Sequence, residues 1–479
     1  MKRIFCAITL LIGAVLYAQN ESEAAALPVV TPVTAPPAVP PPAGAGQSNN
    51  SLEQVRYSTI KYGTETEIVN LIQTLKTEGA DYLDQEIAAL IENTRNQKIL
   101  VGAFSFFGER EKSGLENRAM RAIEERDEEK NETVLAAIDY LGKVKAQNAA
   151  PILRKLIDSN EKRFMNAALR SFGRISGPAG GAGGGNTNDA DAAEYLVDFY
   201  KNNSPDDENR REIITALGAA GSAGAVQFLA GIASDNEERA SLRMAALDSI
   251  AKIGDSGGLD AVLACVSAGD PNLRSAAVTA LGPFSGQAVD DAILDAFRDS
   301  YYRTRSAAAQ ASRQRKLAAA VPYLKFRAER DENPNVKDDS IRALGAIADD
   351  ESIKILEDLF TERKNSDRVR ISAGEMIMRI EPEKFLDRFV MELDDAKQKK
   401  QTALYNGLLK IIGETKSANM DAITRRLMQN SGVIEKSYAL DMAANNRLTG
   451  LADEIKTITN DKNESLAAKA RRTLEKLGL

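Results

Sequence analysis

The sequence of 479 residues contains no histidine and no tryptophan. Histidine is the usual general base and the commonest metal ligand in proteins, so its absence removes Ser-His and Cys-His nucleophile pairs and most metal sites. Only chemistry carried by carboxylates or lysines would remain. We therefore expect a protein that is not an enzyme, with no catalytic residues, no metal and no cofactor.

Aromatic residues are also scarce, at 5% of the chain, and positive charge is in slight deficit. With 62 Lys and Arg against 69 Asp and Glu, the formal net charge is −7. This balance gives no overall basic field, so we expect no nucleic-acid partner. The scarcity of aromatic residues beside frequent alanine favours helices packed through small side chains over an aromatic-rich β-sandwich.

The first eighteen residues, MKRIFCAITLLIGAVLYA, are typical of a signal peptide, with two basic residues, an apolar run and then Ala18. The apolar run of about fourteen residues is shorter than the roughly twenty that span a bilayer, which disfavours an uncleaved anchor. We expect cleavage near Ala18, export to the periplasm or the extracellular space, and no membrane span in the mature protein. Leu16 leaves the cleavage site open, and Cys6 lies inside the run, which disfavours a lipid-modified start.

Residues 19–50 are expected to form a Pro/Ala-rich disordered linker. Residues 27–46 contain seven prolines, which prevent a helix and favour an extended polyproline conformation. The segment acts either as a stiff spacer of about 60 Å, at about 3.1 Å per residue, or as a disordered leader. After cleavage Cys265 is the one remaining cysteine, and its apolar helical surroundings predict a buried thiol and no intramolecular disulfide.

From residue 51 onward the chain repeats itself. Residues 209–218, 273–282 and 336–345 each end in Ala-Leu-Gly, and the position of that glycine recurs in steps of 31–34 residues with one step of 45. Twelve of the thirteen residues just before this position are apolar, with Ser312 the exception, and eight of the thirteen that lie five before it are alanine. The thirteen residues of this column are Lys76, Gly108, Gly142, Gly173, Gly218, Ala251, Gly282, Arg313, Gly345, Met378, Lys410, Ala443 and Glu475.

The spacing predicts a helix that carries each column residue at its end. The alanine and the apolar residue lie four apart, on one helix face, and alanine lets a neighbouring helix approach closely. We expect the column glycine to end this first helix in a left-handed conformation, and a second amphipathic helix to pack back on it. One such pair cannot cover its own apolar faces, so the pairs are expected to stack.

The strings Ala-Leu-Gly-Ala-Ile-Ala at 343–348 and Ser-Ile-Ala-Lys-Ile-Gly at 249–254 resemble HEAT repeats, in the short form of phycobilin-lyase HEAT-like proteins. The resemblance covers residues 51–479. It implies an all-α fold, a right-handed α-solenoid of about 13 helix pairs. Tetratricopeptide and ankyrin repeats have similar periods, but their signature residues are missing. The resemblance implies a scaffold, with a lyase-like enzyme acting through carboxylates as the alternative.

Two segments could be mistaken for ligand sites. The long step contains a glycine-rich insertion at 177–189, which fits no phosphate-binding pattern and is expected to be a loop between helices. Asp331, Asn333 and Asn335 have the spacing of a calcium loop, but valine and arginine replace the required glycine and glutamate. These residues are expected to form an ordinary turn between repeats.

The stretch 298–330 is basic in an otherwise acidic chain, with nine Arg or Lys against two acids. It is either the solvated face of a degenerate repeat or the docking site of an acidic partner. We expect Arg303 and Arg305 to precede the helix and to be more exposed than Arg313. The candidate partner-binding residues are Arg298, Tyr301, Tyr302, Arg303, Arg305, Arg313, Arg315 and Lys316.

These features together predict an exported, non-enzymatic scaffold or adaptor. It would bind a protein partner, or an anionic component of the cell envelope, through its solenoid surface. Arginine and tyrosine suit such contacts, because arginine bonds carboxylates in bidentate fashion and tyrosine adds contact area at low entropic cost.

Overall fold

The computed structural model describes residues 47–177, 187–429 and 432–479, and over these residues it contains 26 α-helices, five short 3-10 helices and no β-strand. The chain divides into a unit of residues 1–55 and a unit of residues 56–479. The expected signal peptide, most of the linker and most of the glycine-rich insertion lie outside the described residues. None of the described helices is long and apolar enough to cross a membrane.

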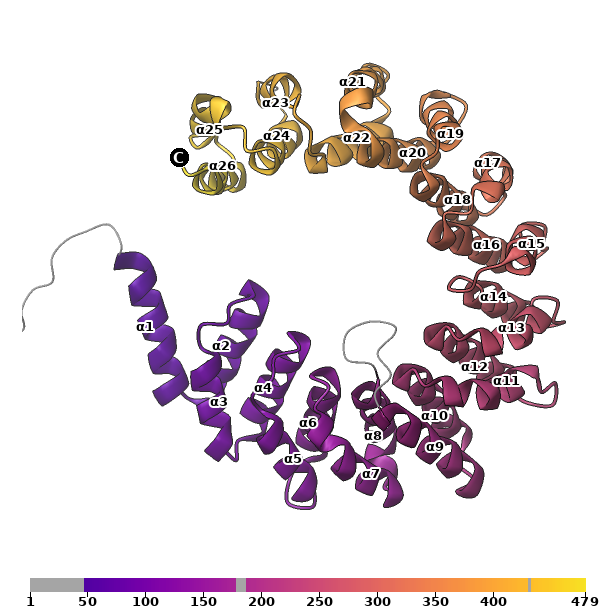
Figure 1. Cartoon of the computed structure of the whole chain (residues 1–479). Helices are drawn as coiled ribbons and strands as arrows, with labels where there is room; N and C mark the ends of the chain where they lie inside the picture. The colour runs from indigo at the N-terminus through magenta and orange to yellow at the C-terminus, as the bar shows by residue number, and fades with distance from the viewer. Residues whose placement is uncertain (1–46, 178–186, 430–431) are drawn as a thin grey trace, which may run out of the picture. The chain divides into compact units, whose positions relative to one another are not determined.

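The helices alternate between two sets along the chain (Figure 1). The even-numbered helices carry the column residues, twelve of them inside a helix and Gly282 two residues after one. They are α2 (Glu65–Glu78), α4 (Gln97–Glu109), α6 (Asn131–Lys143), α8 (Lys162–Ser176), α10 (Asp207–Ala220), α12 (Ala240–Ile253), α14 (Pro271–Ala280), α16 (Tyr302–Arg315), α18 (Pro334–Ile347), α20 (Asp367–Ile380), α22 (Thr402–Glu414), α24 (Val433–Asn445) and α26 (Glu464–Leu477).

The odd-numbered helices lie between them in the sequence. They are α1 (Gln47–Tyr62), α3 (Asp84–Asn93), α5 (Glu116–Glu124), α7 (Ala150–Asp158), α9 (Thr187–Asn202), α11 (Val226–Ser234), α13 (Leu259–Cys265), α15 (Gln287–Ala296), α17 (Val321–Arg330), α19 (Asp350–Thr361), α21 (Pro382–Gln398), α23 (Asp421–Met428) and α25 (Ala452–Ile458).

The even-numbered helices form a continuous layer, because each one from α2 to α24 packs against the next even-numbered helix. The odd-numbered helices form a second layer on top of it, as Figure 1 shows for α11 over α12 and α17 over α18. This arrangement confirms the predicted all-α solenoid of about thirteen helix pairs.

The predicted order within a pair was wrong. The helix with the column residue is the second member of its pair, since α11 packs extensively on α12 and only weakly on α10. The apolar patch that follows each column therefore belongs to the first helix of the next pair. An apolar pattern reports that a helix has a buried face, but it does not report which of two neighbours covers that face.

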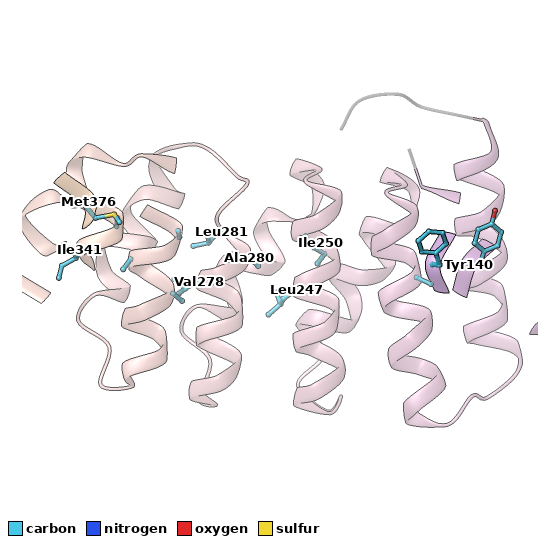
Figure 2. Packing of buried hydrophobic residues seen from close by; sticks show 14 of the residues in the cluster. Tyr140, Leu247, Ile250, Val278, Ala280, Leu281, Ile341 and Met376 are labelled. Atoms are coloured by element: carbon cyan, nitrogen blue, oxygen red, sulfur yellow. The ribbon is translucent and has the colours of Figure 1, made fainter. Parts of the chain in front are cut away.

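The core runs between the layers and between successive even-numbered helices. Leu247 and Ile250 of α12 and Val278 of α14 are fully buried, and Figure 2 shows them on facing helices. Tyr140 of α6 is also buried, and its hydroxyl accepts a bond of 3.0 Å from the backbone N–H of Leu115. Cys265 is buried and free, as predicted from its apolar surroundings.

The column glycines act in helix packing. Gly142, Gly173 and Gly218 lie within helices, where a Cβ at Gly142 would stand 2.7 Å from the Cβ of Ser171 and one at Gly218 would stand 2.7 Å from the Cβ of Ser249. Real Cβ atoms do not approach so closely, so glycine lets adjacent even-numbered helices touch there.

In eight of the thirteen repeats, the left-handed residue that was expected at the column lies three residues after it. It is a glycine in some repeats and a polar residue or alanine in others, namely Gly79, Glu111, Lys145, Gly221, Gly254, Lys316, Ala348 and Gly478. The expectation that the column glycine itself ends the helix was therefore wrong, because a close approach and a left-handed end both favour glycine in a sequence pattern.

Candidate partner-binding site

The basic stretch forms the turn before α16, α16 itself, a short 3-10 helix and α17. Because α16 begins at Tyr302, Arg303 and Arg305 lie in its first turn and do not precede it. Arg303 is exposed, and its Nε donates to the hydroxyl of Tyr302 over 3.2 Å. The ring of Tyr301 packs edge-on to that of Tyr302, with centroids 5.3 Å apart. Arg303 therefore lies against a pair of tyrosine rings at the start of α16.

Arg305 is occupied by the protein itself. Its Nε and Nη2 bond the two carboxylate oxygens of Asp331 at 2.7 and 2.8 Å, and its Nη1 bonds the carbonyls of Asp299 and Ser300 at 3.0 Å. The side chain of Arg305 is 12% exposed and that of Asp331 is fully buried. The expectation that Arg305 is more exposed than Arg313 was wrong, since Arg305 points into the junction with the next repeat and Arg313 is exposed.

The Arg305 arrangement recurs along the array at a position that the sequence analysis missed. A basic residue stands eight residues before the column in six successive repeats. Five of these side chains bond backbone carbonyls at or just after the end of the preceding odd-numbered helix. Four of the six bond a carboxylate that lies further along the chain. The six are Arg210 with Glu238, Arg243 with the Ala233 carbonyl, Arg274 with Asp299, Arg305 with Asp331, Lys337 with the Glu329 carbonyl, and Arg370 with Glu392.

Asp331 also begins the next even-numbered helix. Its Oδ1 accepts from the backbone N–H of Asn333 at 2.9 Å, and the Asn333 side chain accepts from the N–H of Asn335 and caps α18. Burial raises the pKa of the Asp331 carboxyl, but its bonds with Arg305 and Asn333 outweigh burial and hold this pKa below its usual value. The segment with calcium-like spacing is thus a helix start tied to the previous repeat.

This pKa predicts how the stability of the array depends on pH. A carboxyl whose folded pKa is depressed stabilises the fold above its unfolded pKa, and that contribution is lost as the pH falls. We expect Asp331→Asn to lower stability at pH 7 and to flatten its pH dependence below about pH 5, because there the Asp331 carboxyl of the wild type takes up protons in the unfolded state before it does so in the folded state. Chemical denaturation at a series of pH values measures both effects. A variant with the wild-type slope below pH 5 would contradict the assignment.

The other candidate residues divide between two places. Arg298 bonds Asp295 at 2.7 Å and donates to the hydroxyl of Tyr323 at 3.0 Å, at the end of α15. Arg315 bonds the carboxylate of Asp290, and Lys316 is the exposed left-handed residue that ends α16.

The candidate residues therefore lie near the two ends of α16, with Arg303 near its start and Arg313 near its end. Arg303 and Arg313 are ten residues apart, which is roughly 15 Å along a helix. The eight predicted residues consequently lie in two groups, one near each end of α16.

Arg313 lines a surface depression of about 670 Å³ that crosses three even-numbered helices. Its other charged lining residues are Arg342 of α18 and Glu375 and Arg379 of α20. Gly345, Ala346, Met376 and Ile380 complete the lining. The count of charged residues along 298–330 included Arg313 but missed Arg342 and Arg379, because these two residues belong to the next two repeats.

A second hollow lies between the odd-numbered helices α7 and α9. The guanidinium of Arg154 lies 4.1 Å from the centroid of the Tyr195 ring, and the Tyr195 hydroxyl donates to Asp158 at 2.7 Å. Arg154, Tyr195 and Asp158 of this hollow thus contact one another. Among the described residues, no group of three or more His, Cys, Asp or Glu side chains is placed to hold a metal ion.

The alternating helix layers and the thirteen-fold column define a HEAT-repeat protein. The model of the family described as spirochaete HEAT repeat protein matches residues 60–473, and the chain belongs to this family. Among curated proteins, no sequence matches this chain significantly.

Solved structures with a similar chain path include the karyopherin Kap121p bound to the SUMO protease Ulp1p. It has 12% sequence identity and a TM-score of 0.42, and the match covers 90% of this chain and 55% of that one. This chain therefore spans about half the length of Kap121p. The Escherichia coli protein YibA has 14% identity and a TM-score of 0.37, with 56% of this chain and 96% of that chain covered.

Proposed function

We propose that the protein is an exported, non-enzymatic scaffold that binds a protein partner through the surface of its solenoid. The observation that carries this proposal is the continuous layer of even-numbered helices. Such a layer presents a long, regular surface whose exposed side chains vary from repeat to repeat, which is the way that repeat proteins present extended binding surfaces. The basic, apolar start of the chain supports export to the periplasm or the extracellular space.

The alternative of a lyase-like enzyme would need ionisable groups that converge in an enclosed pocket. The depression across α16, α18 and α20 is open to solvent, and a single carboxylate, Glu375, is among its lining residues. An anionic component of the cell envelope remains a second candidate partner. The exposed Arg303 and Arg298 suit either kind of acidic partner.

Cross-linking in the native cells, followed by capture of the tagged protein from the envelope fraction, tests this function. We expect a discrete protein partner whose yield falls as salt is added, because exposed charges mainly accelerate encounter and are screened by salt. N-terminal sequencing of the same sample is expected to begin near Gln19.

The variant Arg303→Glu is expected to reduce the yield, and Arg305→Glu is unsuitable because it would break the bonds with Asp331. A soluble cytoplasmic protein that retains Met1, or capture that never exceeds an untagged control, would refute the proposal.

A further inference from the structure

The depression across α16, α18 and α20 is lined by an excess of positive charge. Three guanidinium groups, those of Arg313, Arg342 and Arg379, line it against the one carboxylate of Glu375. This excess occurs in a chain whose formal net charge is −7. The volume of about 670 Å³ lies within the roughly 300–1,000 Å³ of ligand pockets.

Two of these three arginines have no bonding partner among the described residues. Arg379 bonds Glu375 at 2.6 Å one helical turn away. Arg313 and Arg342 are exposed, and neither has a hydrogen-bond or ion-pair partner among the residues that the structure describes.

Several other charged side chains on the same helices are paired. Asp339 of α18 accepts from Ser306 and Gln310, and Asp338 accepts from Arg368 at 2.7 Å. Arg305 and Arg315 of α16 bond Asp331 and Asp290. The free guanidinium groups are thus concentrated where the depression lies.

The remaining lining of the depression is small or apolar. Met376 and Ile380 of α20 contribute apolar side chains, beside Gly345 and Ala346 of α18. A Cβ at Gly345 would stand 2.7 Å from the sulfur of Met376, so this column glycine gives the methionine room to pack against α18. The depression therefore offers apolar contact beside its guanidinium groups.

We propose that this depression binds an acidic peptide segment of the partner protein. Arg313 and Arg342 each donate two hydrogen bonds to a carboxylate in bidentate geometry, and an apolar side chain between the two carboxylates lies against Met376 and Ile380. A phosphate or a lipid headgroup fits less well, because it makes no use of the apolar lining. The inference rests on the proposed function, since it names the chemistry by which the scaffold holds its partner.

Another explanation is that these arginines only stabilise the ends of their helices. Basic residues in the last turn of a helix interact favourably with its negative end, and Arg313 and Arg379 occupy that turn. That role acts within each helix, so it predicts no binding of an external carboxylate and no dependence on Arg313 and Arg342 together.

The test uses short fluorescent peptides in which two glutamates flank a central leucine at increasing spacing, each with a matched glutamine peptide. We expect the purified mature protein to bind at least one glutamate peptide by anisotropy and not its glutamine counterpart. Arg313→Glu with Arg342→Glu is expected to weaken that binding by at least about tenfold, as for loss of close charge pairs. The control is Arg471→Glu with Arg472→Glu on α26, which makes the same charge change at two exposed arginines and leaves binding unchanged.

Several results would overturn the inference. They are no binding of any glutamate peptide, equal binding by the Arg313 and Arg342 double variant, or equal loss in the α26 control. Tighter binding of inorganic polyphosphate or of anionic lipid vesicles, abolished by the same double variant, would assign the site to phosphate instead.

The outcome for the proposed function is separate. If native capture succeeds and the double variant still retrieves the partner, the scaffold function stands and this site is wrong. If the peptides bind and no partner is captured from cells, the peptide site stands and the proposed scaffold function is wrong.

Discussion

Glu392→Leu is expected to cost about 3–5 kcal/mol of stability, the usual cost of removing one partner of a buried ion pair. Arg370 is 1% exposed, and its Nη2 bonds Glu392 at 2.7 Å while its Nε bonds the carbonyl of Phe360 at 2.9 Å. Without Glu392, a buried guanidinium keeps its charge with only one carbonyl to balance it. The loss follows from this stranded charge and not from the small change in packing.

Two variants control for this explanation. Arg370→Met together with Glu392→Leu removes both charges and is expected to be more stable than Glu392→Leu alone. Asp248→Asn breaks the exposed pair with Lys252 and is expected to change stability by no more than about 0.5 kcal/mol. Denaturant unfolding, with hydrogen exchange to follow α20 and α21, measures the changes. A single variant as stable as the wild type would show that solvent reaches Arg370.

Gly173→Val is expected to destabilise the array by about 3 kcal/mol, at the upper end of typical overpacking costs. A Cβ at Gly173 would stand 2.6 Å from the backbone oxygen and 2.7 Å from the Cα of Ala216 on α10. Because the obstacle is backbone, no side-chain rotation relieves it, and α8 and α10 must move apart.

The matched control is Gly231→Val on α11, an exposed helical glycine whose added Cβ would meet nothing within 4 Å. This change is expected to be neutral or mildly stabilising, because valine favours a helix more than glycine does. Thermal and denaturant unfolding of the two variants decide the matter. Equal stability of both would mean that the column tolerates side chains and that the helix contact is loose.

Much of the fold could be predicted because small side chains recur at fixed positions of each repeat. The recurring column, with alanine five before it in eight of thirteen repeats and an apolar residue one before it in twelve, located the even-numbered helices. The pairing order and the role of glycine could not be read in this way. Gly218 is needed for contact with Ser249 and Gly221 for a left-handed turn, yet both are simply glycines near a helix end.

The candidate site could be predicted only in part. Counting charge along 298–330 found Arg313, but it also selected Arg305 and Arg315, whose partners Asp331 and Asp290 lie about one repeat away in sequence. Such distant partners cannot be seen from local composition. A comparison of equivalent positions between repeats would have revealed the basic residue eight before the column, and so separated Arg305 from the exposed arginines.

The bonds from this basic position have a consequence for dissecting the protein. A fragment that ends directly after α16 would keep Arg305 and lose Asp331, and one that ends after α20 would keep Arg370 and lose Glu392. A boundary drawn at the end of a sequence repeat thus separates the last arginine from its carboxylate partner, which lies in the next repeat. A suitable fragment ends after the carboxylate that pairs with its last arginine. The boundary of a fragment should therefore be chosen from these ion pairs, because the ends of the helices alone would leave an arginine unpaired.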